Sequence, residues 1–152
     1  MAEPPTTSES LFHEDSLDYT PLAHSVTLAR RRATRLVAEW GHPALAGDVA
    51  VVVSELMSNA LLHGSLRDRL IRVRISLTAA ALRVEVSDPR GERLPCPRPA
   101  DVTDQFGRGL LLVAALADRW GVEPRSIGKT VYAEWALALT EAGASHLASV
   151  KE

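Results

Sequence analysis

The sequence predicts an α+β fold in which helices cover one face of a mostly antiparallel, mixed sheet, giving a two-layer α/β sandwich. Two long segments with helical periodicity come first, at 22–40 and 43–63. Segments of alternating polarity follow, and the short turns between them imply antiparallel pairing. Each alternating segment has one polar face, which indicates a sheet that is covered on one side only.

Residues 22–40 and 43–63 form the expected helical layer. In the first segment apolar residues recur at intervals of three and four, and Gly41 suits its end. In the second segment valines and leucines give a broad apolar surface, and Gly64 stands where a left-handed residue would end the helix. The Arg30–Arg32 run lies partly on the outer face of the first helix, where a solvated surface is a simpler interpretation than a docking site.

The sheet is expected from four segments. Residues 71–77 and 82–88 alternate apolar with polar residues around a turn at Thr78–Ala81. Residues 120–124 and 130–137 form a second pair. Between the two pairs, residues 89–106 form a proline-rich, aperiodic loop of a length that is often functional, and a third helix is expected from Leu110 to about Ala117.

Composition places the chain among ordinary globular domains, with 46% hydrophobic and 24% charged residues in 152. The net charge of −2 gives no basic field for nucleic acid, and the single Cys96 excludes an internal disulfide and a cysteine-built zinc site. We see no signal peptide, and no stretch that approaches the ~20 apolar residues of a membrane helix. We therefore expect a cytoplasmic protein with neither nucleic acid nor membrane as a partner.

The chain divides into three expected parts. Residues 1–18 are polar and acidic and predict a flexible N-terminal arm. Residues 19–139 contain all of the periodic segments and form the folded domain. Residues 140–152 are expected to be a frayed C-terminal tail.

Three polar residues interrupt apolar faces. Glu55 and Asn59 share one side of the second helix at i and i+4, beside its apolar stripe. Asp88 has the parity of the inward Leu82, Val84 and Val86. Glu55 and Asn59 could simply occupy an exposed face, and Asp88 could simply end a strand before Pro89. Together they instead suggest a polar pocket between helix and sheet.

Gly107-Arg108-Gly109 directly precedes the third helix. Glycines there let backbone N–H groups approach an anion at the helix N-terminus. The spacing is not that of the dinucleotide fingerprint, since no third glycine follows. Gly128-Lys129-Thr130 is not a P-loop either, because Glu123 replaces its first glycine and a strand follows.

Four ordered motifs carry a family resemblance: ELMSNALLHG (Glu55–Gly64), VEVSD (Val84–Asp88), GRGLLLV (Gly107–Val113) and GKTV (Gly128–Val131). This pattern resembles the GHKL ATPase superfamily, which includes gyrase-type, chaperone-type, histidine-kinase and MutL-type ATP sites. At this size the chain is most similar to anti-sigma-factor serine kinases and single-domain actinobacterial regulators. The resemblance implies a Bergerat-type ATP-binding fold over 19–139, with ATP and Mg²⁺ as cofactors.

The resemblance also implies roles for individual residues. Asn59 would coordinate Mg²⁺, Glu55 would act as the catalytic general base, and Asp88 would accept a hydrogen bond from the adenine amino group. The remaining nucleotide-binding residues would be Gly91, Gly107, Arg108, Gly109 and Thr130. The sequence departs from the family at two places. Only Gly91 remains of the glycine box after Asp88, and Lys129 separates Gly128 from Thr130.

The leading functional interpretation, from the same resemblance, is an anti-sigma-factor-like regulator that phosphorylates a serine or threonine of a small antagonist protein. A sigma factor and this antagonist would be its partners, and a homodimer is suggested. The alternative is a non-catalytic module of the same fold whose nucleotide gates protein binding. A histidine-kinase-type domain acting in trans is less favoured because the dimerising phosphoacceptor helices are absent, and an ATPase machine because no transducer domain follows.

Overall fold

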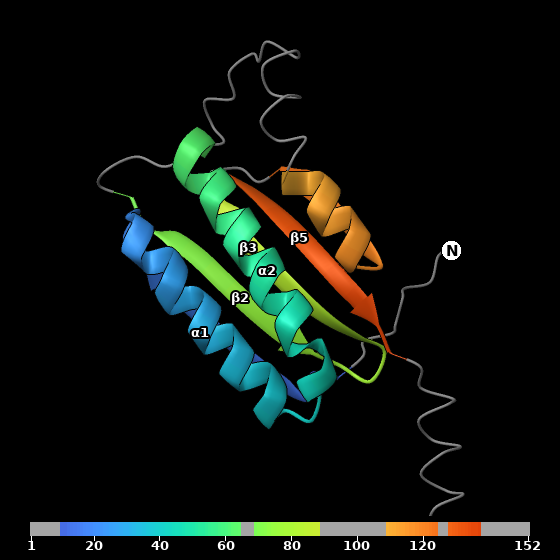
Figure 1. Cartoon of the computed structure of the whole chain (residues 1–152). Helices are drawn as coiled ribbons and strands as arrows, with labels where there is room; N and C mark the ends of the chain where they lie inside the picture. Colours follow the sequence, from blue (N-terminus) through green and yellow to red (C-terminus); the bar gives the residue numbers. More distant parts are fainter. Residues whose placement is uncertain (1–9, 65–68, 89–108, 125–127, 138–152) are drawn as a thin grey trace, which may run out of the picture.

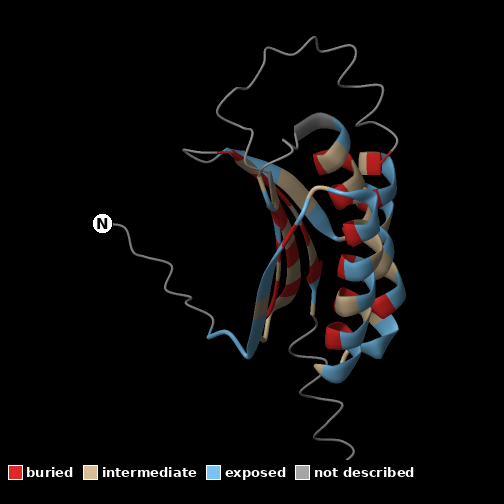
Figure 2. Ribbon diagram, turned by 90° about the vertical axis from the view of Figure 1, so that its left-hand side faces the viewer, coloured by how far each residue is buried: buried red, intermediate tan, exposed pale blue. Residues whose placement is uncertain are grey.

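Two layers make up the part of the chain that the computed structural model describes, residues 10–64, 69–88, 109–124 and 128–137. A five-stranded sheet forms one layer and helices cover one of its faces (Figures 1 and 2). This confirms the predicted α+β sandwich. The elements are β1 (His13–Tyr19), α1 (Ala23–Glu39), α2 (Pro43–Asn59), the π-helical turn η1 (Ala60–Gly64), β2 (Ile71–Leu77), β3 (Ala81–Asp88), a helix over residues 109–116, β4 (Arg119–Pro124) and β5 (Lys129–Ala136).

The strands are ordered β1-β2-β3-β5-β4 and every described pairing is antiparallel. The expected mixture of parallel and antiparallel strands is therefore wrong for the described sheet. Strands β2 and β3 form the predicted hairpin, in which the Thr78 backbone N–H donates to the Ala81 carbonyl at 2.9 Å. A short turn of this kind can join only antiparallel neighbours, which accounts for the pairing of β2 with β3.

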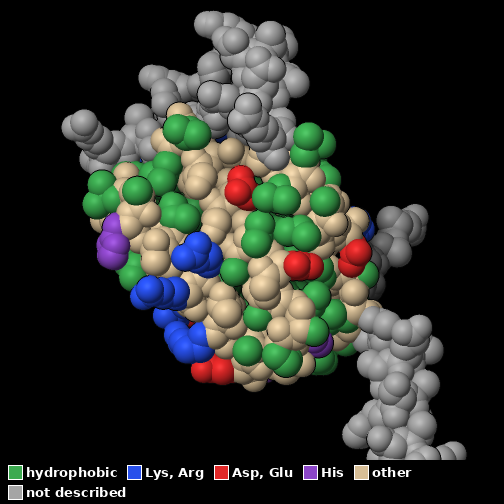
Figure 3. Space-filling model, viewed as in Figure 1, with side chains coloured by type: hydrophobic (Ala, Val, Ile, Leu, Met, Phe, Trp, Pro, Cys, Tyr) green, Lys and Arg blue, Asp and Glu red, His purple; other side chains and the backbone are tan. Residues whose placement is uncertain are grey.

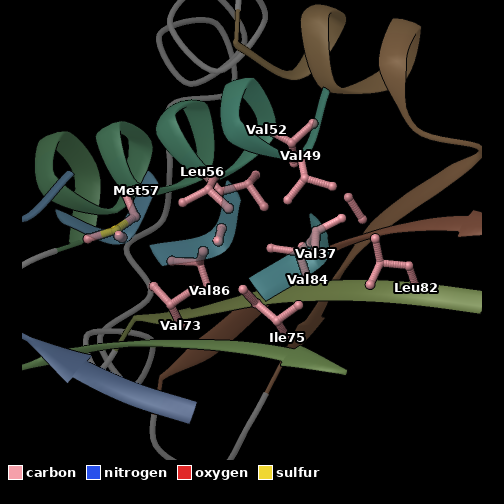
Figure 4. Close-up of a cluster of buried hydrophobic side chains, with 14 of the residues drawn as sticks. Val37, Val49, Val52, Leu56, Met57, Val73, Ile75, Leu82, Val84 and Val86 are labelled. Carbon is pink, nitrogen blue, oxygen red and sulfur yellow. The ribbon is translucent and has the colours of Figure 1, made fainter. Parts of the chain in front are cut away.

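The core lies between the sheet and the helices (Figure 4). Alternate residues of β2, β3 and β5 point toward the helices and are buried, with cross-strand pairs such as Ile75–Val84 and Val84–Ala133. Helix α2 supplies the opposite wall with Val49, Val52 and Val53, all fully buried. The strict alternation of the strands therefore separates a helix-covered face of the sheet from an open face.

Helix α2 corrects one expectation. The segment Pro43–Leu62 is long and apolar enough, by length and composition alone, to cross a membrane. We expected no such stretch. In the folded domain its apolar side packs against α1 and the sheet, with Leu56 and Met57 almost completely buried. About two fifths of the segment is buried in this way, and other apolar side chains of it, such as Leu62 at 70% exposed, lie at the surface.

Strand β1 corrects a second expectation, because a flexible arm was predicted over residues 1–18. Residues 13–19 instead pair with β2 along their whole length. Only Tyr19 of this strand is buried, so its sequence carries no apolar alternation that would predict a strand. Ion pairs add to this backbone ladder: Asp15 pairs with Arg32 of α1, and Glu14 and Asp18 pair with arginines of β2. Residues 1–9 and the predicted tail at 140–152 lie outside the described residues, as does the predicted loop at 89–106.

The open face of the sheet is charged. Arg83 donates hydrogen bonds to Glu85, Glu134 and Glu123 at 2.7, 2.7 and 3.1 Å. Burial disfavours its charged form, but these three bonds outweigh that effect and raise the pKa of Arg83 above its ordinary value. Its guanidinium also lies 4.0 Å from the ring centre of Tyr132.

Gly121 of β4 permits this stacking. A Cβ added there would lie 2.7 Å from the Tyr132 hydroxyl oxygen. We expect Gly121→Ala to displace the ring and to lower the free energy of unfolding by about 1–3 kcal/mol, the usual cost of overpacking.

Gly47→Ala is the matched control: nothing lies within 4 Å of its added Cβ in α2. It should stabilise the protein by roughly 0.5–1 kcal/mol, because alanine is the better helix former. Urea denaturation of both variants tests this, and equal effects would contradict it.

The ions of β1 predict an acid-labile edge. Hydrogen bonds from Arg32 and Arg72 hold the pKa values of Asp15 and Asp18 below their ordinary 3.8. A lowered folded-state pKa stabilises the fold above about pH 4, and this contribution is lost as pH falls through the folded-state value. The melting temperature of the Asp15→Asn/Asp18→Asn variant should therefore fall less between about pH 6 and pH 2 than that of the wild type. Glu39→Gln, which changes an exposed carboxylate of α1, should show the same fall in melting temperature as the wild type. If the melting temperature of the double variant fell as much as that of the wild type, Asp15 and Asp18 would not be the source of the acid sensitivity.

Candidate functional site

Glu55 and Asn59 lie in the last two turns of α2, on the side that borders the core. Glu55 is half-buried, and Asn59 is only 8% exposed. The Nδ2 atom of Asn59 is buried and has no hydrogen-bond partner among the described residues. Buried amide groups are rarely left unpaired, so this atom marks a place where a ligand or an ordered water belongs.

The turn η1 begins directly after Asn59. The sequence predicted an uninterrupted α-helix as far as His63, whereas the structure widens into a π-helical turn over Ala60–Gly64. Such single π-turns occur frequently at functional sites. Both α2 and η1 contact β3, so this end of the helical layer lies over that strand.

Gly109 brings the next element to the same place. It is the first described residue of the helix over 109–116 and is buried. A Cβ at Gly109 would lie 3.0 Å from Glu55 Oε1 and 3.4 Å from both Asn59 amide atoms. Only glycine allows this approach without displacement, so the start of the helix meets Glu55 and Asn59 directly. A helix N-terminus stabilises negative charge, such as the Glu55 carboxylate or an anionic ligand.

The other end of this helix is fixed to the sheet. The indole N–H of Trp135 in β5 donates to the Leu116 carbonyl at 2.9 Å, and Val113 is fully buried. Asp118 then accepts a hydrogen bond from the Ala136 backbone N–H at 2.7 Å. The position of Gly109 is therefore set by core packing and by two hydrogen bonds to β5.

Asp88 is placed by the ladder at the end of β3. It shares the parity of Leu82, Val84 and Val86, which face the helices, and it pairs in register with Lys129, the first residue of β5. In Figure 1 the C-terminal end of α2, the start of β5 and the start of the helix over 109–116 lie at one end of the domain. Glu55, Asn59, Asp88 and Gly109 therefore belong to the same end of the helix-covered side.

Thr130 does not join this group. In the β3–β5 register it pairs with Ser87, and the hydroxyl groups of the two residues are 2.9 Å apart. Both have the parity of Glu85 and Tyr132, on the face of the sheet away from the helices, where Thr130 is nevertheless only 2% exposed. The inserted Lys129 explains the difference, because a shift of one residue along a strand exchanges its two faces. Lys129 takes the helix-side position, which the sequence analysis missed although strand parity alone could have indicated it.

Gly91, Gly107 and Arg108 lie outside the described residues, so their predicted roles stay predictions. Within the described ranges there is no group of three or more His, Cys, Asp or Glu side chains that could hold a metal by themselves. The oxygen atoms of Glu55 and Asn59 suit Mg²⁺, which is commonly held by one or two side chains together with phosphate oxygens. The residues present therefore fit a metal that arrives with a phosphate ligand.

Comparison with known proteins gives one family match. Residues 19–143 match the family described as "Histidine kinase-like ATPase domain". An uncharacterized protein of Streptomyces coelicolor is 48% identical over 60 residues, which are 38% of this chain and 56% of that protein. The match thus spans just over half of the length of that relative.

Two solved structures share the fold. The crystal structure of the RsbU and RsbW domains of a Mycobacterium tuberculosis protein superposes with a TM-score of 0.62 at 18% identity, over 83% of this chain and 33% of that one. The SiaB–SiaC complex of Pseudomonas aeruginosa gives a TM-score of 0.52 at 15% identity, over 84% of this chain and 91% of that chain. At these identities the likeness shows the fold alone.

The contact at Gly109 can be tested without a ligand. Gly109→Ala should destabilise the protein, because its added Cβ displaces the Glu55 carboxylate. In a Glu55→Ala background the carboxylate is gone, so that cost should disappear. A double-mutant cycle by urea denaturation should therefore show coupling of at least about 0.5 kcal/mol. Identical effects of Gly109→Ala in the two backgrounds would contradict the contact.

Proposed function

Because the chain belongs to the histidine kinase-like ATPase family, we propose that it binds Mg-ATP and transfers the γ-phosphoryl group to a serine or threonine hydroxyl of a partner protein. The observation that carries this proposal is the meeting of three groups at the end of α2. A buried amide with an unpaired nitrogen, a carboxylate and the start of a helix come together where Gly109 touches Glu55 and Asn59.

Glu55 is the group suited to receive a proton. It is half-buried, and its Oε1 atom lies at the start of the helix over 109–116. In the proposed reaction the acceptor oxygen forms a bond to the γ-phosphorus while the bond to the β–γ bridging oxygen breaks. Glu55 takes the hydroxyl proton, and ADP leaves with the bridging oxygen.

Asn59 is the group suited to hold the metal. Its amide oxygen would bind Mg²⁺, which supplies charge neutralisation for the phosphates when it is bound. Its buried amide nitrogen is the donor left unpaired among the described residues, and it could then donate to a phosphate or water oxygen. One side chain would thereby contribute both a ligand and a donor.

Asp88, at the end of β3, would accept a hydrogen bond from the adenine amino group. Gly107, Arg108 and Gly109 would surround the phosphates. Gly91 would stand beside the base. The helix over residues 109–116 supports this arrangement, since amides at a helix N-terminus favour a phosphate. A contact from Thr130 stays a proposal: its strand parity is opposite to that of Asp88, and its hydroxyl lies 2.9 Å from that of Ser87.

The proposed partners are a sigma factor and an antagonist protein that carries the phosphorylated residue, in the cytoplasm, with a homodimer as the proposed assembly. One structure of the same fold was solved as a protein complex, of SiaB with SiaC, which supports a protein partner here. The alternative is a nucleotide-gated binding module without catalysis. The replacement of the family's glycine box by Asp88-Pro89-Arg90-Gly91 favours that alternative.

Two variants of α2 separate these functions. Asn59→Ala should lower Mg-ADP affinity and phosphoryl transfer together, because a metal ligand acts in the ground state. Glu55→Ala should leave affinity nearly unchanged and, in a kinase, slow transfer by roughly 10²–10⁴-fold. Affinity is measured by calorimetry, and transfer by label from γ-labelled ATP onto candidate antagonists encoded by neighbouring genes.

The matched control is Glu39→Ala, which removes an exposed carboxylate from α1. It should resemble the wild type in both measurements. Wild-type protein that binds Mg-ADP but labels no antagonist would favour the non-catalytic module. Wild-type protein that binds no nucleotide would refute both functions.

A further inference from the structure

The first rung of the β3–β5 ladder pairs an acid with a base on the helix-covered face. Asp88 and Lys129 stand opposite each other, and the next rung on this face is Val86–Val131, whose side chains are buried. Directly opposite residues of an antiparallel pair have Cβ atoms about 4.5–5.5 Å apart. Any ligand group that reaches Asp88 is therefore also within reach of the long side chain of Lys129.

The backbone fixes this parity. Gly128 has a φ of +92°, a conformation that suits glycine, and β5 begins at the following residue. Lys129 thus takes the helix-side position and Thr130 the open-side position, where its hydroxyl lies 2.9 Å from that of Ser87. The other cross-strand neighbour of Lys129 is Pro124 of β4, which carries no charge. Asp88 is therefore the charged neighbour of Lys129 in the ladder.

An acceptor from an aspartate and a donor from a lysine together match one edge of adenine. The exocyclic N6 amino group is a donor, and the adjacent ring atom N1 is an acceptor. Lysine offers only donors and an ionised aspartate only acceptors. Guanine presents the reverse order along the same edge, an acceptor at O6 and a donor at N1.

We propose that Lys129 is a specificity-determining residue that donates a hydrogen bond to N1 of the adenine ring while Asp88 accepts from N6. This inference rests on the proposed nucleotide site and assigns its base recognition to the two cross-strand residues. The sequence analysis named Thr130 as the nucleotide-binding residue at the start of this strand, whereas this inference gives the contact with the base to Lys129. The site then excludes guanine because the donor and acceptor positions are exchanged.

The experiment measures binding by calorimetry with Mg-ADP, Mg-GDP and Mg-1-deaza-ADP, in which a C–H group replaces N1. Wild-type protein should bind ADP at least about tenfold more tightly than 1-deaza-ADP, as expected for a bond to a charged group. GDP should bind more weakly than ADP. Lys129→Met should bind ADP about tenfold more weakly than the wild type does. Its affinity for 1-deaza-ADP should equal that of the wild type, because 1-deaza-ADP has no N1 atom for Lys129 to bond.

Lys129→Arg, which retains a donor, should keep part of the preference for ADP over 1-deaza-ADP. Arg35→Met, which removes an exposed cation from α1, should behave as the wild type. Melting temperatures of all variants show whether each one is folded. If Lys129→Met does not fold, Lys129→Arg takes its place, and equal wild-type affinities for ADP and 1-deaza-ADP would still refute the inference.

The inference fails if wild-type protein binds ADP and 1-deaza-ADP equally. It also fails if Lys129→Met binds ADP as the wild type does, or weakens ADP and 1-deaza-ADP to the same extent, because Lys129 would then act away from N1. These results would leave the proposed nucleotide-binding function unaffected. Wild-type protein that binds none of the three nucleotides would instead refute the proposed function.

Discussion

The close approach of Gly109 to Glu55 and Asn59 is the contact on which the rest of the site depends. It joins two helices that are separated in sequence by β2 and β3, and a Cβ added at Gly109 would lie 3.0 Å from Glu55 Oε1. Trp135 and Asp118 hold the far end of the helix on β5, so core packing contributes to this approach. The polar groups of α2 are therefore positioned by the same contacts that stabilise the domain.

Sequence patterns predicted the helices and β2 to β5 because burial on one side imposes regular spacing. Glu55 and Asn59 could be found in the same way, as polar residues beside an apolar stripe. Strand β1 could not be predicted from such patterns. Its ion-pair partners are arginines of α1 and β2, which lie far away in the sequence. The π-turn after Asn59 and the approach of Gly109 also depend on tertiary contacts. Thr130 was assigned from its motif position, and strand parity places it on the other face.

The two faces of the sheet divide the chemistry of the molecule. The face under the helices holds the core and, at one end, the polar groups of the candidate site. The opposite face holds Arg83 and its glutamates. The helical side carries charge as well: basic side chains gather along α1, and apolar side chains are exposed around α2 and the helix over residues 109–116, including Leu111 at 71% exposed (Figure 3).

The ionic attachment of β1 has a kinetic consequence. Pairing β1 with β2 closes a loop on the order of fifty residues, whereas the β2–β3 hairpin closes across a few and α1 packs on the helix that follows it. Long loops cost more entropy to close, and β1 buries little apolar surface in return. We therefore expect β1 to dock late in folding and to open first in the native state. Its amide hydrogens should exchange with solvent before those of β3, which has a strand on each side; equal protection of the two strands would contradict this order.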